Sequence, residues 1–261
     1  MKIKKWFFGL NSDSDWVHNY ERYIKCAVNS ALENTDLEPH FLYDDIKGDI
    51  GIIKWLEDKN IKIHRLSSRF VGEMEKESDY SVITGKGAFL RVEIPEVVKN
   101  NYEDEYVLYT DCDVIFLKEF SFKGKCEFFA CAPEFNINDW SLCNTGAMVM
   151  NINNLYNTLD EFSQFIRDHG IGKFPAFDQG AYNHFYRKKW DKLNPIYNWK
   201  PYWGIENDAG ILHFHGLKIE NIEKIFDGKI DDIAPVLSNM YKANSISYKH
   251  YYEIAQKYEN Q

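Results

Sequence analysis

Two aspartates interrupt an apolar stretch in the middle of the chain. Asp111 and Asp113 lie within VLYTDCDVIFL, residues 107–117, whose other side chains are mostly β-branched, aliphatic or aromatic, as in a buried strand. Residues two apart in extended backbone point to the same side, so the two carboxylates converge. Two partly desolvated anions are costly unless one takes up a proton or a cation bridges them. Mg²⁺ or Mn²⁺ would bridge them through oxygen ligands and keep positions for phosphate groups.

The two aspartates also fit an interpretation without a metal. One of them would cap a turn, and the other would pair with a lysine or an arginine. Candidate metal or phosphate ligands lie in ILHFHGLK, where His213 and His215 alternate along a predicted strand, ahead of Gly216 and Lys218. Alternate histidines suit metal or phosphate binding, whereas a histidine pair near a domain edge is more often only hydrogen-bonded.

Two further polar segments supply candidates. In CNTGAMVMNINNL, Asn144 begins a small polar turn ahead of a predicted strand at residues 147–150. In FDQGAYNHF, Asp178 and Gln179 lie at the start of a predicted helix. An aspartate at that position can also act simply as the N-cap.

The elements that would position these residues alternate between strand and helix. Predicted strands are residues 5–10, 39–45, 61–66, 106–110 and 147–150, and predicted helices are residues 19–32, 52–58 and 87–98. LNPIYNW is expected to be a short strand or loop with aromatic walls. The alternation is typical of a parallel sheet covered by helices, in which ligands lie beyond the carboxyl ends of the strands. Asp111 and Asp113 would lie in that crevice.

The composition indicates a globular, acidic protein. The chain has 261 residues, of which 44% are apolar and 16% aromatic, enough for one large α/β domain or two small ones. A formal charge of -9 without a basic stripe argues against nucleic acid as a partner, while a small phosphorylated ligand fits if a metal offsets its charge. The five cysteines form no C-x-x-C pair and are expected to be reduced, mostly buried thiols rather than zinc ligands: Cys26, Cys112, Cys126, Cys131 and Cys143.

The two ends of the chain bear on localisation. No stretch approaches the roughly 18 apolar residues of a membrane span, and the N-terminal apolar run becomes acidic too soon for a signal peptide, so a cytoplasmic protein is expected. The C-terminal stretch from Tyr241 is rich in Tyr and Lys. It fits an amphipathic helix in peripheral contact with a membrane or acceptor lipid, and equally a helix packed on the domain.

The motifs YTDCDVIF, NTGAMVMNI, FDQGAYN, YNW and HFHGLK, in this order, resemble those of GT-A glycosyltransferases. They are most similar to glycosyltransferase family 8, which includes bacterial lipopolysaccharide galactosyl- and glucosyltransferases and glycogenin. The resemblance runs from about Lys5 to about Lys218. It implies an α/β, Rossmann-like GT-A fold with a mostly parallel central sheet and helices on both faces. This single catalytic domain would span residues 1–226, with a C-terminal helical tail at residues 227–261.

The resemblance also implies a role for each matching residue. The metal ligands for Mn²⁺ or Mg²⁺ would be Asp111, Asp113 and His213. The residues that contact the UDP-sugar donor would be Asn11, Tyr20, Arg91, Asp111, Asn144 and Lys218. Among these, Tyr20 would stack on uracil and Lys218 would hold the diphosphate. The catalytic pair beneath the transferred sugar would be Asp178 and Gln179.

Two segments depart from the family's pattern. The family has one more residue between the Gly and Lys of the last motif, with Pro-Trp after it, whereas this chain has GLKI, residues 216–219. The loop NSDSDWVHN, which contains Asp13, is longer than the family's tight Asp-Asn-Tyr turn. These departures bear on the roles of Lys218 and Asn11, and His215 has no fixed role in the family.

The implied activity is transfer of a hexose, galactose or glucose by family habit, from a UDP-sugar to a hydroxyl of a glycan or glycolipid acceptor. The metal would neutralise the departing diphosphate. The family implies retention, for which we favour front-side attack by the acceptor hydroxyl, and an inverting relative with Asp178 as general base stays open. Acceptor contacts are expected from aromatic side chains: Trp140, His184, Trp199 and Trp203.

Two other classes of protein fit part of the pattern. A nucleotidyltransferase would also use a parallel sheet and paired acids, but it should carry a glycine-rich, basic loop after the first strand, where NSDSDW is acidic and lacks glycine. An inactive carbohydrate-binding module would explain the aromatic residues, but it would not need the acid pair and His213 together. Release of free UDP from donors in the presence of Mn²⁺ separates the three classes.

Overall fold

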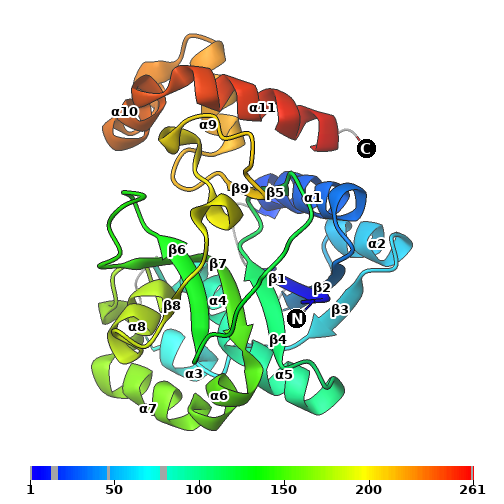
Figure 1. Cartoon of the computed structure of the whole chain (residues 1–261), viewed down its shortest axis with the longest axis vertical. Helices are drawn as coiled ribbons and strands as arrows, with labels where there is room; N and C mark the ends of the chain where they lie inside the picture. Colours follow the sequence, from blue (N-terminus) through cyan, green and yellow to red (C-terminus); the bar gives the residue numbers. More distant parts are fainter. Residues whose placement is uncertain (1, 13–16, 46–47, 77–80, 260) are drawn as a thin grey trace. The chain divides into compact units, whose positions relative to one another are not determined.

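A seven-stranded sheet with the order β3-β2-β1-β4-β7-β6-β8 forms the framework of the first of two compact units (Figure 1). Its strands are β1 Lys5–Asn11, β2 Glu38–Asp44, β3 Lys62–Arg65, β4 Tyr106–Thr110, β6 Phe129–Pro133, β7 Cys143–Asn151 and β8 Asp191–Lys192. The computed structural model describes residues 2–12, 17–45, 48–76, 81–259 and 261. The first unit comprises Met1–Val17, Leu37–Asp111 and Ser121–Leu193, and the second His18–Asp36, Cys112–Phe120 and Asn194–Gln261.

Four strands form the parallel half of the sheet. β1 pairs in parallel with β2 on one edge and with β4 on the other, and β3 extends the sheet from β2. Nearly every residue of β1, β2 and β4 is buried, as expected for strands that are covered on both faces. The chain between these strands contains α2 Gly51–Asp58, α3 Val71–Met74, α4 Ser81–Ala88, the 3₁₀ helix η1 Phe89–Glu93 and α5 Ile94–Asn101. The predicted alternation of strand and helix is therefore present.

The other half of the sheet contains the antiparallel strand β7 and a bulge, and its edge strand β8 pairs in parallel with β6. β7 runs antiparallel to both β4 and β6. On β6, Cys131 lies opposite Met148, whereas the next residue, Ala132, lies opposite Asn144. Residues 145–147 therefore have no counterpart on β6, and β7 bends there. The strand predicted at residues 147–150 is present, but it begins earlier, at Cys143, so Asn144 belongs to a bulged strand rather than a turn.

The helices that follow β7 enclose an aromatic core against the sheet. They are α6 Ile152–Asn157, α7 Leu159–His169 and α8 Asp178–Phe185, coloured green to yellow-green beside β6 and β7 in Figure 1. Sheet and helices share one apolar cluster, whose aromatic members include Phe7, Phe70, Phe89, Phe129, Phe162, Tyr182 and Tyr186. Because burial of each such side chain contributes about 1.5–3 kcal/mol, this cluster holds α8 firmly against β7.

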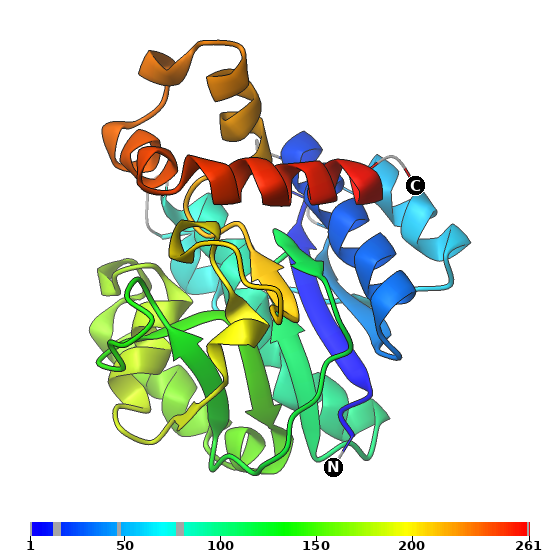
Figure 2. The same ribbon diagram turned by 45° about the horizontal axis from the view of Figure 1, so that its top comes forward.

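The second unit assembles from three segments that are far apart in the sequence. Its two-stranded antiparallel sheet pairs β5 Val114–Phe116 with β9 Ile211–His213. Its helices are α1 Val17–Asn34, α9 Ile219–Phe226, α10 Pro235–Ala243 and α11 Ser245–Glu259. Figure 2 shows α11 (red) as one long uninterrupted helix at the end of the chain.

Polar contacts join α1 to the C-terminal helices. The guanidinium of Arg22 lies 2.6 Å from Glu223 of α9 and 2.5 Å from Glu259 of α11. Asn29 Nδ2 donates to the carbonyl oxygen of Tyr258 at 2.8 Å. The C-terminal helix therefore packs on its own unit, as in the second interpretation of the Tyr- and Lys-rich tail.

Three predicted elements differ from the observed ones. The helix expected over residues 87–98 is divided between α4, η1 and α5, and Pro95 lies in the first turn of α5, where its missing N–H costs nothing. The segment expected as a strand or loop is the 3₁₀ helix η3 Pro195–Asn198. β9 ends at His213, so His215 lies outside the strand.

Other expectations concern the whole chain. All five cysteines are buried and free, as predicted. Within the described residues, no helix is both long and apolar enough to cross a membrane. The domain boundary between residues 226 and 227 stays a prediction, and contacts group residues 194–261 in one unit. The loop at residues 13–16, which includes Asp13, lies outside the described residues.

Candidate active site

The order of the strands reverses next to β1. β2 and β3 continue the sheet on one side of β1, and β4 pairs with its other edge. Open α/β sheets bind ligands beyond the carboxyl ends of the strands at such a reversal. Asn11 is the last residue of β1, and Asp111 directly follows the last residue of β4. Both residues predicted to contact the donor therefore lie at this edge of the sheet.

Arg91 links Asp111 to the bulged strand. Its side chain is buried, and Nη2 donates to Asp111 Oδ1 at 2.9 Å. Nη1 donates to the carbonyl oxygen of Thr145, in the bulge, at 2.5 Å. The Tyr109 ring lies 4.3 Å from the guanidinium carbon, and its hydroxyl donates to the same Asp111 oxygen at 2.9 Å. Asp111 is thus fixed by one cationic and one neutral donor on neighbouring elements.

Asp178 lies against the same arginine without a hydrogen bond from it. Asp178 Oδ2 is 2.7 Å from Arg91 Nε, but the single Nε–H donates to the carbonyl oxygen of Ala88, at 3.2 Å. The side chain of Asp178 is completely buried. Burial raises the pKa of Asp178 to about 7, against the opposing charge of Arg91 and with a further increase from Asp111. Phe177 occupies the N-cap position of α8, so Asp178 is not the cap.

Gln179 is held by the start of β7. Its Oε1 accepts from the Thr145 backbone N–H at 3.0 Å and from Asn144 Nδ2 at 3.2 Å. The other end of the Asn144 amide, Oδ1, accepts from the Gly146 N–H at 3.1 Å, and Nδ2 also donates to Glu134 Oε2 at 2.8 Å. Because Oε1 of Gln179 is occupied by these donors, its half-buried Nε2 is the group able to donate to a ligand.

The backbone before Asp178 is strained. Ala176 and Phe177 have φ values of 53° and 54°, in the left-handed region that side chains disfavour. Each such residue costs roughly 1–3 kcal/mol and persists only when the surroundings enforce it. A Cβ on Gly180 would lie 2.3 Å from the carbonyl oxygen of Pro175, so only glycine allows this approach. The strained turn and Gly180 together place Gln179 against the bulged segment of β7 and Asp178 against Arg91.

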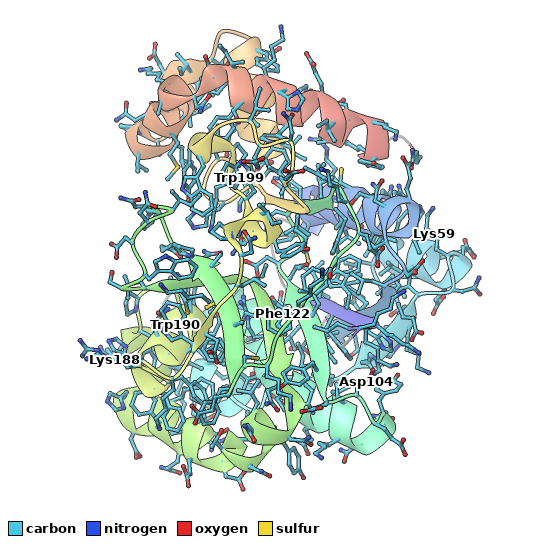
Figure 3. The ribbon with its side chains drawn as sticks, viewed as in Figure 1. Lys59, Asp104, Phe122, Lys188, Trp190 and Trp199 are labelled. Carbon is cyan, nitrogen blue, oxygen red and sulfur yellow. The ribbon has the colours of Figure 1, made fainter. Side chains whose placement is uncertain are left out.

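A cavity of about 820 Å³ opens beside Gln179 within the first unit. Trp140, Leu142, Pro175 and Trp190 form most of its apolar wall. Two residues that were expected to contact the acceptor, Trp140 and His184, line it. Figure 3 labels Trp190 together with Lys188, another of its lining residues.

In the second unit, His213 is oriented by an amide. His213 Nδ1 lies 2.9 Å from Asn198 Oδ1, and an amide oxygen can only accept, so Nδ1 carries a proton. In neutral imidazole this leaves the lone pair on Nε2, which lies 3.5 Å from Asp113 Oδ1. A metal-binding histidine typically makes such a hydrogen bond through its other nitrogen. His215 is different, because its Nδ1 lies 2.9 Å from the Tyr202 hydroxyl.

Lys218 accompanies Asp113. Its ammonium donates to Asp113 Oδ2 and to the carbonyl oxygen of Phe214 at 3.0 Å. Burial alone would raise the pKa of Asp113, but the charge of Lys218, together with the neighbouring His213, outweighs it and holds that pKa below its ordinary value. Asp113 is therefore a carboxylate, and its charge calls for cations nearby.

The remaining candidates of the second unit have structural partners. Tyr20 lies half-buried on α1, with its ring edge-on to Tyr23 at a centroid distance of 5.7 Å. Trp199 is buried, and its Nε1 donates to the carbonyl oxygen of Gly204 at 2.8 Å. Trp203 packs on Trp199 at 5.4 Å. Trp199 is thus part of the fold of this unit rather than an exposed acceptor platform.

The predicted residues fall into two groups, one in each unit. In the first unit, the structure brings together Arg91, Asp111, Asn144, Asp178 and Gln179, and places Asn11 at the same edge of the sheet. In the second, it brings together Asp113, His213 and Lys218. The ion pairs of Asp111 with Arg91 and of Asp113 with Lys218 correspond to the interpretation without a metal.

Three residues of these groups were not predicted. Glu134 and Asn198 bind Asn144 and His213 through contacts between distant segments, and no local pattern marks them. The contact of Tyr109 with Asp111 could have been predicted from the sequence, because in extended backbone residues two apart point to the same side.

The chain resembles several solved glycosyltransferases, although no family model and no curated protein matches its sequence. GlyE of Streptococcus pneumoniae TIGR4, in its apo form, is similar with a TM-score of 0.63 and 16% identity, over 94% of this chain and 64% of that chain. LgtC in complex with donor and acceptor sugar analogs is similar with a TM-score of 0.59 and 14% identity, over 82% of this chain and 88% of that chain. Mouse xyloside xylosyltransferase 1 is similar with a TM-score of 0.58 and 12% identity, over 83% of this chain and 99% of that chain.

These similarities show the fold. The chain has the GT-A fold, an α/β architecture with a mostly parallel central sheet, as predicted. It spans less than two thirds of the length of GlyE.

Proposed function

We propose that this protein is a glycosyltransferase that moves a hexose, galactose or glucose, from a UDP-sugar to a hydroxyl of a glycan or glycolipid acceptor. The observation that carries this proposal is the cluster of Arg91, Asp111, Asp178 and Gln179 beyond the carboxyl end of β4, in a fold that the chain shares with glycosyltransferases. This cluster combines two carboxylates, one cation and one amide donor beside a cavity. A sugar with several hydroxyls requires such a mixture of acceptors and donors.

Asp178 and Gln179 are proposed to lie beneath the transferred sugar. The Gln179 amide can donate from Nε2, and the buried Asp178 carboxyl lacks a hydrogen-bond donor on Oδ2 among the described residues. The strained backbone before Asp178 and the hydrogen bonds to Gln179 hold both side chains in place, and this limits their reorganisation during the reaction. LgtC has been solved as an active-site mutant with glutamate in place of a glutamine. That precedent is consistent with a role for Gln179.

A divalent cation is proposed for Asp111, Asp113 and His213. These side chains each offer one ligand atom, and the two carboxylates and one imidazole suit Mn²⁺ or Mg²⁺. The hydrogen bond from His213 Nδ1 to Asn198 leaves Nε2 as the ligand atom on the side of Asp113, so the donor set fits. When bound, the ion would stabilise the negative charge of the departing diphosphate.

Several residues of the chain itself would prepare the donor. Arg91 and Tyr109 orient the Asp111 carboxylate through Oδ1, which leaves Oδ2 for a ligand. The Lys218 ammonium pairs with Asp113, and it can pair with a phosphate of the donor instead. Tyr20 is proposed to stack on the uracil ring, and Asn11 to contact the nucleotide. Asn144 is proposed to meet the sugar.

Retention by front-side attack remains our proposal for the stereochemistry. Because its pKa is near 7, the Asp178 carboxyl is only partly ionised at neutral pH, unlike an ordinary carboxyl. Its proximity to Arg91 also makes it a poor nucleophile. The raised pKa also favours the second candidate, an inverting enzyme in which Asp178 is the general base, because a base works best when its pKa is near the working pH.

The proposal is tested by incubating the purified chain with a panel of UDP-sugars and Mn²⁺ and measuring the release of UDP, with and without EDTA. UDP release from one donor, abolished by EDTA, is the expected result. Pyrophosphate formed from a sugar phosphate and UTP would identify a nucleotidyltransferase instead. Sugar binding without release of UDP from any donor would identify a carbohydrate-binding module. The anomeric proton of the product in NMR spectra distinguishes retention from inversion.

A further inference from the structure

The cavity beside Gln179 has a wall suited to a sugar ring. Trp140 and Trp190 stack with ring centroids 6.3 Å apart and an angle of 30° between their planes. Both rings are half-buried, so each keeps some surface exposed. The C–H groups on one face of a pyranose are apolar and pack on aromatic faces of this kind. The volume of about 820 Å³ is sufficient for more than a single monosaccharide.

The rim of the cavity is positively charged, although the chain carries a formal charge of -9. Arg187, Lys188 and Lys192 line it, against a single carboxylate, Glu134. Glu134 is buried and accepts a hydrogen bond from Asn144, so it already has a donor. The cavity therefore has an excess of positive charge.

The cationic groups of the rim are available for a ligand. Arg187 and Lys188 are exposed, and among the described residues neither has a carboxylate partner. The Lys192 ammonium lies 4.6 Å from the centroid of Trp140, over the ring, which places positive charge directly at the aromatic wall. A planar guanidinium beside an ammonium is a suitable receptor for a phosphate or a carboxylate.

The backbone at this rim is constrained as well. Lys188 has a φ of 63°, in the left-handed region, within the turn that connects α8 to β8. Figure 3 labels Lys188 and Trp190, which both line the cavity. Such strain persists where the surroundings enforce a particular direction of the chain, and it is common at ligand-binding sites. Here it accompanies three cationic side chains and one aromatic ring that line the cavity within residues 187–192.

We propose that this cavity binds the acceptor, and that the acceptor is a sugar bearing a negatively charged group, a phosphate or a carboxylate. This inference rests on the proposed function, because Gln179 connects the cavity with the transferred sugar. The sugar ring packs on Trp140, and the charged group lies between Arg187 and Lys192. An acceptor hydroxyl then points toward Gln179.

Three probes with the same pyranose ring test the inference: methyl glucoside, methyl glucoside 6-phosphate and methyl glucuronide. With a saturating active UDP-sugar and Mn²⁺, transfer to at least one charged probe should exceed transfer to methyl glucoside by about tenfold or more in kcat/KM. Arg187→Gln and Lys192→Gln should each bring this ratio down by at least about threefold, and the double variant close to one. Which charged probe is preferred tells phosphate from carboxylate.

Lys189→Gln is the matched control. Lys189 belongs to the same basic segment, but it does not line this cavity, so its replacement should leave the ratio at the wild-type value. A ratio close to one in the wild-type protein, or a ratio that Arg187→Gln and Lys192→Gln leave unchanged, would overturn the inference. So would an equal loss in the Lys189→Gln variant, because it would reflect only overall charge.

A binding experiment separates this inference from the proposed function. Saturation-transfer NMR with each probe, in the absence of donor, reports which probe contacts the protein. Preferential binding of a charged probe that is lost in Trp140→Ala supports the cavity even if no UDP-sugar is hydrolysed, in which case the proposed function fails. Release of UDP without any preference for a charged probe in binding or transfer would leave the proposed function intact and refute the inference.

Discussion

The single positive charge of Arg91 cannot neutralise both of the carboxylates next to it. One guanidinium donates to Asp111 and also lies 2.7 Å from Asp178, in a buried environment. The pKa of Asp178, raised to about 7 chiefly by burial, is the consequence. A single proton on Asp178 therefore decides whether this cluster is neutral or carries a net negative charge near pH 7.

The first prediction concerns catalysis by Asp178 and Gln179. Asp178→Asn and Gln179→Ala should each lower kcat by about tenfold or more, a barrier increase of at least about 1.4 kcal/mol, with UDP affinity nearly unchanged. The reason is that these side chains are proposed to contact the sugar and not the nucleotide. Gln179→Glu is a sharper variant, because it keeps the acceptor for the Thr145 N–H but removes the Nε2 donor. Wild-type turnover in all three variants would contradict the assignment.

The second prediction concerns the pH dependence of stability. The folded-state pKa of Asp178 is above the ordinary value, so its contribution to stability is complete below about pH 4 and is lost as the pH rises through about 7. The free energy of unfolding should fall between about pH 4 and pH 7, with a slope from this residue of at most about 1.4 kcal/mol per pH unit. Urea denaturation in EDTA measures it, with Asp178→Asn as the control, which should have a flatter profile. Parallel profiles would show that Asp178 keeps an ordinary pKa.

The third prediction concerns the metal. UDP should bind more tightly with Mn²⁺ than without it, and His213→Ala should reduce this difference much more than His215→Ala, because Nδ1 of His215 is engaged with Tyr202. Asn198→Ala should weaken the effect of Mn²⁺ by about 10- to 100-fold, since Asn198 fixes the tautomer of His213. Calorimetric titrations check both. Equal effects of the two histidine replacements would refute the metal assignment.

The chemistry of single residues was predictable where a short segment contains all the information. Asp111 follows a continuous apolar strand, and its predicted place at the carboxyl end of that strand is confirmed, whereas the ligand site stays a prediction. The pairing of Lys218 with Asp113 joins residues 105 positions apart, and that of Asn198 with His213 depends on a 3₁₀ turn without periodicity. Such partners follow from tertiary packing and leave no local pattern.

At the level of elements, the start of α8 depends on close packing of its first turn. Gly180 faces the Pro175 carbonyl oxygen, which a Cβ would approach to 2.3 Å. Two left-handed residues, Ala176 and Phe177, directly precede α8. The positions of Asp178 and Gln179 thus depend on the absence of a Cβ at Gly180.

The fourth prediction follows from this contact. Gly180→Ala should destabilise the protein by about 1–3 kcal/mol, because the backbone must move, and it should lower kcat as well. Gly72→Ala is the matched control, since Gly72 is helical and its Cβ would meet nothing within 4 Å. The control should be neutral or slightly stabilising, by less than about 1 kcal/mol. Thermal denaturation and kcat measurements check both variants, and equal melting temperatures would contradict the steric argument.

Most elements of the sheet were predictable because their patterns are strong. β1, β2 and β4 are short apolar runs bounded by polar residues, and β4 has the predicted bounds. The bulge in β7 was missed, because the small polar segment at Asn144 looks like a turn when its partners on β6 are unknown. The division of residues 87–98 could have been anticipated from Pro95.

On the scale of the molecule, the second unit combines α1 with the C-terminal helices, and α11 covers part of α1. The Cys26 thiol lies 3.5 Å from the carbonyl oxygen of Ala255, and burial raises the pKa of Cys26 to about 12. The sequence pattern does not indicate this grouping, because its contacts connect segments more than two hundred residues apart, as between Asn29 and Tyr258 at 229.

The fifth prediction tests this packing. A chain that ends at Asn244 lacks α11 and should expose Cys26, which should then react with a thiol reagent, whereas the full chain should resist labelling because its thiols are buried. Mass spectrometry of the labelled peptides identifies the site. Cys131, in the core of the first unit, is the internal control and should stay unlabelled in both proteins. An unreactive Cys26 in the shortened chain would show that α11 does not protect it.

The separation of the segments has a consequence for biosynthesis. α1 is translated more than two hundred residues before its partner α11, and β1 likewise precedes its partner β4 by about a hundred residues. At about 5–20 residues per second, α1 spends on the order of ten seconds or more without the helix that covers it. Nascent chains with such high contact order fold slowly and expose apolar surface meanwhile. This protein should therefore complete its second unit only after α11 has been translated, and chaperones that bind exposed apolar helices should improve its yield.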